Sequence, residues 1–297
     1  MIFLNIGVIG GDLRTIRLAQ MYAKEENMIY TYGLDRYFSE KNLNDDNNIQ
    51  IEEHNKNIII CDNIKKAIDE SEIVISGMPF SKDGVYVNAP YAKEKIKIEE
   101  LLKELEHKTF FAGGIPKKFE GNAIKCFDLL QCEELTILNA IPTVEGTIKI
   151  VIEEREETIF ESNVLICGYG RIGKILCKVF KNLGANVYCA ARKEADLAWI
   201  REGKYVPLRY DEICEYAPKI NIVINTVPSL VITKKELDTF NEDVLIVDVA
   251  SNPGGIDKEY ATSKNIKVIT ALGIPGKEFP KTAAKFIKEA MLQFTVC

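Results

Sequence analysis

The segment 163–193 constrains the fold of this 297-residue chain more than any other part of it. An apolar run, Val164–Cys167, leads into the glycine sequence Gly168-Tyr169-Gly170-Arg171-Ile172-Gly173. A helical spacing of apolar residues follows and stops at Gly184, and a second apolar run, Val187–Ala190, comes next. A strand, a glycine turn, a helix and a strand in this order are the context in which a dinucleotide-binding fingerprint is meaningful.

Each part of the glycine sequence has a predicted role. Gly168 permits a tight turn, Gly170 has no side chain to block a pyrophosphate, and Gly173 lets the helix lie close to its strand. The helix that begins near Arg171 and Ile172 presents backbone N–H groups and its positive dipole end to phosphates. The pattern therefore predicts a dinucleotide site, and the alternative is a degenerate domain of this kind that binds nothing.

The end of the second strand indicates which dinucleotide binds. An NAD site usually carries Asp or Glu there to hold the ribose 2′-hydroxyl, but this chain has Ala191, Arg192 and Lys193. A guanidinium pairs well with a phosphate. We therefore predict NADP as the cofactor, with Arg192 and Lys193 at its 2′-phosphate.

Strands alternate with helices along the whole chain, which predicts an α/β fold of two doubly wound domains with parallel sheets. Residues 1–141 are expected to form an N-terminal Rossmann-like or flavodoxin-like substrate domain, without GxGxxG and so without a second dinucleotide. Residues 142–280 are expected to form the NADP-binding Rossmann domain, opened by a connecting helix at 142–158, and 281–297 a helix that packs back on the first domain. Ser39–Asn57 is predicted to be a surface loop. The predicted strands are Ile6–Ile9, Ile29–Tyr32, Ile58–Cys61, Ile73–Ser76, Phe110–Ala112, Lys125–Phe127, 164–167, 187–190, 205–208, 222–226, 244–248 and 267–270.

Composition excludes several classes of function. The net charge of −6 argues against nucleic acid as a main partner. The eight cysteines include no CxxC pair, and the two histidines, His54 and His107, lie far apart, so no metal site is predicted. We find neither a signal peptide nor a run that approaches the roughly 18 apolar residues of a membrane span. The chain is expected to be cytoplasmic and to have no membrane contact.

Further cofactor contacts are predicted where a strand of the second domain ends. Asn225, Thr226, Val227 and Pro228 follow such a strand, and ligands of Rossmann sheets bind beyond the carboxyl ends of the strands. A turn with only local hydrogen bonds is the alternative. For Asp248, at the next such end, a capping role and a cofactor contact are both open.

Cationic residues near helix starts are the candidates for substrate binding. Arg14 follows the first glycine turn, and Lys277, Lys281 and Thr282 precede or open the last helix. An arginine, or a lysine beside a helix N-terminus, suits a carboxylate, although a solvated lysine remains an alternative. No residue is assigned as catalytic, because GxSxG is absent and neither histidine lies at a strand end. Hydride transfer, in which the cofactor carries most of the chemistry, is consistent with the absence of an assigned catalytic residue.

Several segments together resemble the dipicolinate synthase A-subunit family of spore-forming bacteria over nearly the whole chain. The resemblance is carried by Gly7–Arg14, Ile141–Gly146, the glycine fingerprint followed by Ala191-Arg192, Ile224–Pro228, and Gly273–Gly276 with Pro280–Ala283.

This resemblance implies NADP-dependent oxidation of dihydrodipicolinate, or of its hydrated precursor, to dipicolinate (pyridine-2,6-dicarboxylate) in the mother cell during sporulation. It also implies a flavoprotein-like partner, the B-subunit of dipicolinate synthase, and we expect an oligomer. A flat dianion as product suits Arg14 and Lys281 facing each other across a cleft. The alternatives are another two-domain NADP dehydrogenase, similar to shikimate or alanine dehydrogenase, and a nucleotide-sensing protein without catalysis.

Overall fold

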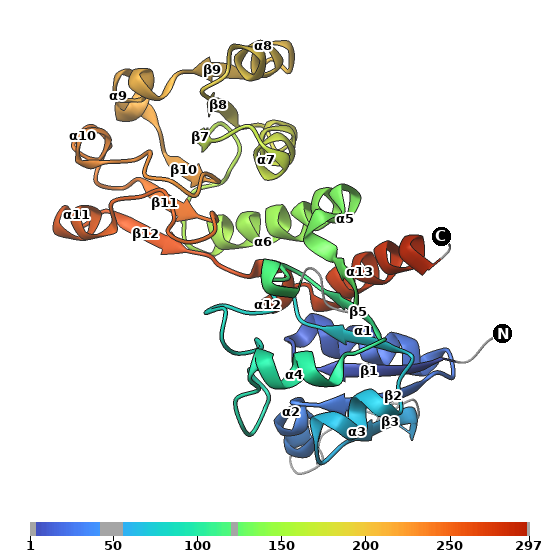
Figure 1. Cartoon of the computed structure of the whole chain (residues 1–297). Coiled ribbons are helices and arrows are strands. Elements are labelled where there is room, and N and C mark those ends of the chain that lie inside the picture. Colours follow the sequence, from blue (N-terminus) through green and yellow to red (C-terminus); the bar gives the residue numbers. More distant parts are fainter. Residues whose placement is uncertain (1–3, 42–55, 120–123, 296–297) are drawn as a thin grey trace. The chain divides into compact units, whose positions relative to one another are not determined.

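The chain folds into two compact units, which are described separately (Figure 1). The computed structural model describes residues 4–41, 56–119 and 124–295. Unit 1 comprises Met1–Leu138 together with Pro275–Cys297, and unit 2 comprises Asn139–Ile274. The chain therefore leaves unit 1, builds all of unit 2 and returns to complete unit 1.

Unit 1 contains a six-stranded parallel sheet in the order β3-β2-β1-β4-β5-β6. This is the Rossmann order, so of the two sheet types expected for the first domain the Rossmann type is the one present. The strands are β1 (Asn5–Ile9), β2 (Met28–Tyr32), β3 (Ile58–Ile60), β4 (Ile73–Ser76), β5 (Thr109–Ala112) and β6 (Lys125–Asp128).

Helices cover both faces of this sheet. On one face α1 packs with the last helix, α13, over Ile6, Val8 and Phe111 of the strands. On the other face α3 and α4 pack over Val74 and Phe110. The helices of unit 1 are α1 (Leu13–Lys24), α2 (Asp35–Lys41), α3 (Ile64–Asp69), α4 (Ile98–Glu104), α5 (Glu133–Leu138), α12 (Ile274–Lys277, whose first residue belongs to unit 2) and α13 (Pro280–Thr295).

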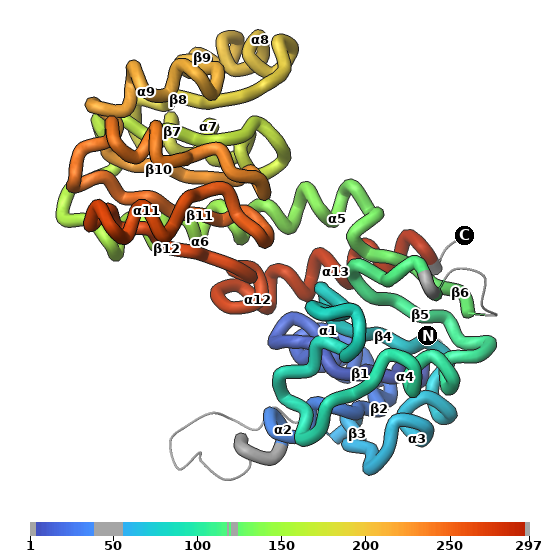
Figure 2. Tube along the Cα trace, turned by 60° about the vertical axis from the view of Figure 1, so that its left-hand side comes forward, coloured from blue at the N-terminus to red at the C-terminus, as the bar shows by residue number. Residues whose placement is uncertain are grey.

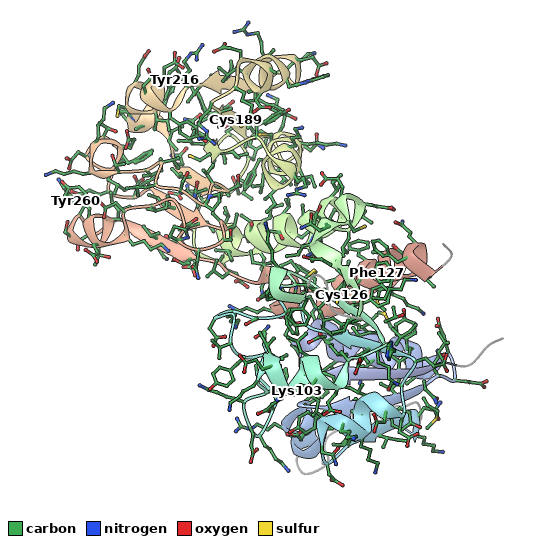
Figure 3. The ribbon with its side chains drawn as sticks, viewed as in Figure 1. Lys103, Cys126, Phe127, Cys189, Tyr216 and Tyr260 are labelled. Atoms are coloured by element: carbon green, nitrogen blue, oxygen red, sulfur yellow. The ribbon has the colours of Figure 1, made fainter. Side chains whose placement is uncertain are left out.

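The helix α13 is an integral part of unit 1, although it follows unit 2 in the sequence. It packs along α1 (Figure 2) and buries Ala284, Ile287, Ala290 and Met291 in the same core as the sheet. At its far end the ring of Phe294 lies 5.0 Å from that of Phe127 on β6, which is labelled in Figure 3. Without α13 one face of the unit 1 sheet would lose part of its cover.

Unit 2 repeats the same architecture with a second six-stranded parallel sheet, in the order β12-β11-β10-β7-β8-β9. The central strands read as unbroken apolar runs because helices bury both of their faces. The strands are β7 (Asn163–Cys167), β8 (Asn186–Ala190), β9 (Val206–Leu208), β10 (Ile222–Asn225), β11 (Leu245–Asp248) and β12 (Lys267–Thr270).

The helices of unit 2 also divide between the two faces. The first face is covered by α6, α7 and α8, whose Val144, Leu176 and Ile200 share a core with alternate residues of the strands. The second face is covered by α9, α10 and α11. Their bounds are α6 (Ala140–Glu153), α7 (Arg171–Asn182), α8 (Glu194–Glu202), α9 (Ile213–Tyr216), α10 (Lys234–Leu237) and α11 (Lys258–Ser263).

Two predicted elements differ from the observed ones. The connecting helix, predicted at 142–158, runs over Ala140–Glu153, because its apolar stripe ends at Val151 and a charged run begins at Glu153. The helix α2 occupies the first residues of the predicted loop Ser39–Asn57, of which 42–55 lie outside the described residues.

In the described part of the chain, α5 and α6 together form one helical stretch, Glu133–Glu153, that is long and apolar enough to cross a membrane by length and composition. This corrects the sequence-based expectation that no segment approaches such a span. In its most apolar stretch 44% is buried inside the structure, and Leu135, Val144 and Val151 belong to the cores of the two units. Core helices of globular proteins share these properties, so the helix is weak evidence for a membrane.

Candidate functional site

Two of the three fingerprint glycines are required by close packing within unit 2. Gly168 follows β7 with φ +99°, a conformation that favours glycine, and a Cβ there would lie 2.5 Å from Oγ1 of Thr226. A Cβ on Gly173 would lie 2.0 Å from the carbonyl oxygen of Gly168. The turn and the first coil of α7 therefore pack on each other with no room for a side chain.

The third glycine, Gly170, faces open space. No heavy atom lies within 4 Å of the position that its Cβ would take. Gly170 is the N-cap of α7 and has no side chain to cap the helix, which begins at Arg171. The start of α7, with Ile172 half-buried behind it, thus has no side-chain cap from its N-cap residue. A pyrophosphate fits such an open helix N-terminus.

The corresponding turn of unit 1 differs at the position of Gly170. The N-cap of α1 is Asp12, whose side chain accepts from the N–H of Arg14, whereas α7 has no side-chain cap. The N–H of Gly11 donates to the carbonyl oxygen of Asn88 over 2.8 Å. The chain's own loop covers this turn, which supports the expectation that only unit 2 holds a dinucleotide.

A pocket opens beside the fingerprint, where β8, β9 and β10 end. Arg192 enters it from the end of β8, whereas Lys193 is the exposed N-cap of α8 and does not line it. The pocket is lined by Arg192, Tyr210, Asp211, Ser229, Leu230, Val231, Thr233 and Glu236. Its place next to the second strand is where a Rossmann domain receives the adenosine end of a dinucleotide.

Burial shapes the chemistry of the groups in and under this pocket. Burial raises the pKa of Tyr210 well above its ordinary value, although the nearby Arg192 acts in the opposite direction. The phenol therefore stays protonated at neutral pH. Beneath the fingerprint, contact with Cys177 and burial raise the pKa of the Cys189 thiol on β8, which is labelled in Figure 3. A thiol of this kind is inert packing rather than a nucleophile.

The predicted contacts at the end of β10 hold the loop itself together. Asn225 is fully buried, and its Nδ2 donates to Oδ1 of Asp248 over 2.8 Å and to the carbonyl oxygen of Val227 over 3.0 Å. The hydroxyl of Thr226 donates to the carbonyl oxygen of Cys167 over 2.8 Å. These side chains tie the end of β10 to β7 and β11, while Pro228 is exposed beyond them. Cofactor contact by these four residues stays a prediction.

Asp248, for which two roles were open, has a structural one. Its carboxylate accepts from the N–H groups of Ala250 and Gly255, each over 3.3 Å, and Oδ2 lies 3.7 Å from Nζ of Lys258. In the pairing of β10 with β11, Asp248 lies directly beside Asn225. The fully buried carboxylate fixes the loop that follows β11.

In unit 1 the predicted carboxylate-binding arginine already holds a carboxylate of the protein. Arg14 is 6% exposed, and its Nη2 lies 2.7 Å from Oδ2 of Asp12, the N-cap of α1. The same guanidinium also donates to the carbonyl oxygen of Met78. A Cβ on Gly276 would lie 3.0 Å from Nε of Arg14, so the pair is covered as well as satisfied. The geometry gives Arg14 a structural partner, and its role toward a substrate stays a prediction.

The other three predicted substrate residues gather at the start of the last helix. Lys281 and Thr282 lie in the first turn of α13, Lys277 ends α12, and all three are exposed. Lys281 makes no ion pair with any residue that the structure describes. Both lysines are therefore available to an anion, in contrast to Arg14. Arg14 and Lys281 both belong to unit 1, and a cleft between them stays a prediction.

Sequence reasoning missed the residues that complete the adenosine-side pocket. Tyr210 and Asp211 follow the third strand of unit 2, and Ser229 and Leu230 lie just beyond Pro228. The rule that ligands gather at strand ends applies to them as well, but in the sequence they stand outside any motif. Among the described residues no cluster of His, Cys, Asp or Glu is suited to a metal. His54 lies outside those residues.

Comparison with known proteins agrees with this division of the chain. Residues 5–129 match the family described as the N-terminal domain of the dipicolinate synthase A-subunit. Residues 146–258 match the NAD-binding domain of D-isomer-specific 2-hydroxyacid dehydrogenases. Unit 2 is thus a nicotinamide dinucleotide-binding domain of dehydrogenase type.

Relatives match over almost the full length. The dipicolinate synthase A-subunit of Bacillus subtilis (strain 168) is 31% identical over 294 residues, which cover 97% of this chain and 94% of the relative. The crystal structure of the Bacillus subtilis A-subunit matches with a TM-score of 0.79 and 30% identity, covering 100% of this chain and 97% of that one. That of the A-subunit from Bacillus halodurans matches with a TM-score of 0.80 and 25% identity, covering 97% and 96%. The chain therefore belongs to the dipicolinate synthase A-subunit family.

Proposed function

We propose that this chain is an NADP-dependent oxidoreductase that converts dihydrodipicolinate, or its hydrated precursor, to dipicolinate during sporulation. The observation that carries the proposal is the open phosphate turn at Gly170, adjoining a pocket that holds Arg192 where NAD sites usually carry an acid. The name of the Bacillus subtilis relative supports the product. We place the chain in the cytoplasm of the mother cell.

The proposed reaction removes two electrons from the ring of the substrate. When bound, NADP accepts a hydride, and a proton leaves the ring, so that dihydrodipicolinate and NADP⁺ yield dipicolinate, NADPH and H⁺. Because the product ring is aromatic, the oxidation is strongly downhill. The protein then has to bind and orient the two reactants rather than supply a strong base.

The residues of the chain divide this work between the two units. The N–H groups at the start of α7 hold the pyrophosphate, and Arg192 holds the 2′-phosphate. The exposed Lys281 and Lys277 attract the carboxylates of the substrate. A partner protein, proposed to be the flavoprotein-like B-subunit of the synthase, assembles with this chain, since the relative is itself named as one subunit of an enzyme.

Calorimetric titration of NADP and NAD tests the cofactor assignment. NADP is expected to bind at least about tenfold tighter, since a charge-assisted contact contributes roughly 1.5–3 kcal/mol. Arg192→Asp should weaken NADP and leave NAD nearly unchanged. Lys193→Gln is the matched control, because Lys193 is a neighbouring exposed cation outside the pocket. Equal affinities of the parent for the two cofactors would contradict the assignment.

The reaction is tested by following NADPH formation with a freshly prepared dihydrodipicolinate-pathway intermediate, with and without the partner protein. Turnover in either arm supports the proposal. Tight NADP binding without turnover in both arms would instead indicate a nucleotide-sensing role.

A further inference from the structure

The adenosine-side pocket carries charges of both signs on its walls. Arg192, from the end of β8, is its cation. Asp211, which follows β9, and Glu236, which lies on α10, are its acids. The pocket therefore does not present a simple positive surface to a 2′-phosphate.

The two acids differ in what their carboxylates do. Glu236 is 6% exposed, and its Oε2 accepts from the N–H and the hydroxyl of Thr233 over 2.9 and 2.6 Å. It serves the capping box of α10. Asp211 is exposed, and its carboxylate has no hydrogen bond or ion pair with any described residue. Asp211 is the acid whose carboxylate is available to a ligand.

The rest of the wall fits the adenosine end of a dinucleotide. Leu230 is 59% exposed at the rim and continues into Val231, and the ring of Tyr210 lies on the same pocket. A base can pack on these apolar groups while its ribose meets the polar ones. The ribose hydroxyls of NAD are donors that a carboxylate accepts, whereas a 2′-phosphate is repelled by it.

We propose that Asp211 is a specificity-determining residue that accepts a ribose hydroxyl of NAD and opposes the 2′-phosphate of NADP. The acid that NAD sites carry after the second strand is thus replaced by one that follows the third strand, and it limits the preference that Arg192 creates. This inference rests on the proposed binding of a dinucleotide by unit 2.

The test uses calorimetric titration of the full-length chain with 2′,5′-ADP and with 5′-ADP, which represent the adenosine ends of the two cofactors. Asp211→Asn should bind 2′,5′-ADP about fivefold tighter, because a like charge is removed. It should bind 5′-ADP weaker, because an ionised acceptor is replaced by a neutral one. The gain for 2′,5′-ADP should shrink at roughly 1 M salt, where exposed charges are screened.

Asp243→Asn is the matched control. It removes the same charge from an exposed aspartate of unit 2 that precedes β11 and lies outside the pocket. This variant should leave the affinity for both nucleotides unchanged.

The outcomes separate this inference from the proposed function. If Asp211→Asn leaves the ratio of the two affinities unchanged while Arg192→Asp lowers it, Asp211 plays no part in selection and the cofactor assignment stands. If Asp243→Asn changes the ratio of the two affinities by the same factor, the effect comes from the net charge of the chain alone, and the proposed role of Asp211 is overturned. If neither nucleotide binds the parent at millimolar concentration, both the inference and the proposed function fail.

Discussion

At the scale of single residues, the three fingerprint glycines serve two different purposes. Gly168 and Gly173 are required by contacts inside the protein, whereas no such contact requires Gly170, since nothing lies within 4 Å of its missing Cβ. Substitutions at the two kinds of position should therefore have separable effects on stability and on binding.

We expect Gly170→Val to unfold at the parent's temperature and to lose cofactor binding, because its side chain would occupy the pyrophosphate position. Gly173→Val should instead lower the melting temperature, since its Cβ would lie 2.0 Å from a carbonyl oxygen. Thermal unfolding and NADP titration of the two variants check this. Normal NADP affinity in Gly170→Val would mean that the fingerprint does not hold the phosphates.

Arg14 and Lys281, grouped by the sequence as anion-binding cations, should also behave differently. Arg14→Ala leaves Asp12 and the carbonyl of Met78 without their partner and should cost about 1–3 kcal/mol of unfolding free energy. Lys281→Ala should leave stability unchanged and raise the Michaelis constant for the dicarboxylate by about tenfold. Urea unfolding and steady-state kinetics give the two readouts. A parent-like Michaelis constant in Lys281→Ala would place the carboxylate site elsewhere.

The role of a residue was predictable from the sequence only where its residue type and position allow a single role. The glycine pattern falls in this class. Asn225 does not, because a buried amide at a strand end and an amide that contacts a ligand have the same sequence signature. The pairing of Arg14 with Asp12 depends on a side-chain direction, and α1 turns the guanidinium back onto its own N-cap.

At the scale of elements, the strands were predictable because both sheets are parallel and covered on both faces, so each strand is a continuous apolar run between turn residues. Short polar helices were not. The helix α2, with the sequence DRYFSEK, has no regular apolar stripe, and its existence depends on neighbours that are distant in sequence.

The helix α13 allows a direct measure of how much one element stabilises unit 1. Ile287 is 4% exposed in the core shared with α1. Its substitution by Ala should lower the free energy of unfolding by about 2–4 kcal/mol. Leu292 lies on the same helix and is 50% exposed. The control Leu292→Ala should lower the free energy of unfolding by about 0.5 kcal/mol or less. Similar losses in urea unfolding of the two variants would show that α13 does not pack on unit 1 as described.

At the scale of the whole molecule, the chain consists of two units whose Rossmann sheets have the same strand order. Unit 2 is continuous in sequence, whereas unit 1 is interrupted by unit 2 and regains its last helix after it. The parallel sheets followed from the alternation of strands and helices, whereas the strand order of unit 1 was left open between the Rossmann-like and flavodoxin-like types. The expectation that only unit 2 holds a dinucleotide also came from the sequence, because unit 1 lacks GxGxxG. In the structure Asp12 caps α1, whereas Gly170 leaves α7 without a side-chain cap.

A shortened chain that ends at Glu278 tests whether α13 completes unit 1. It lacks α13, so the face of unit 1 that α13 covers loses its cover, while all the strands and the pocket of unit 2 remain. We expect hydrogen exchange to be much faster in α1 and β1 of this shortened chain, and its affinity for 2′,5′-ADP to stay near that of the parent. Retained protection of α1 would contradict the assignment of α13 to unit 1.

The return of the chain to unit 1 also sets an order of events during synthesis on the ribosome. Unit 2 is contiguous, so all of its strands are translated before α13. Until then the apolar face of α1 has no partner helix and presents the kind of surface that chaperones bind. The nucleotide-binding half of this protein is therefore translated in full before the last helix, and the half that we propose to receive the substrate is completed only by that helix.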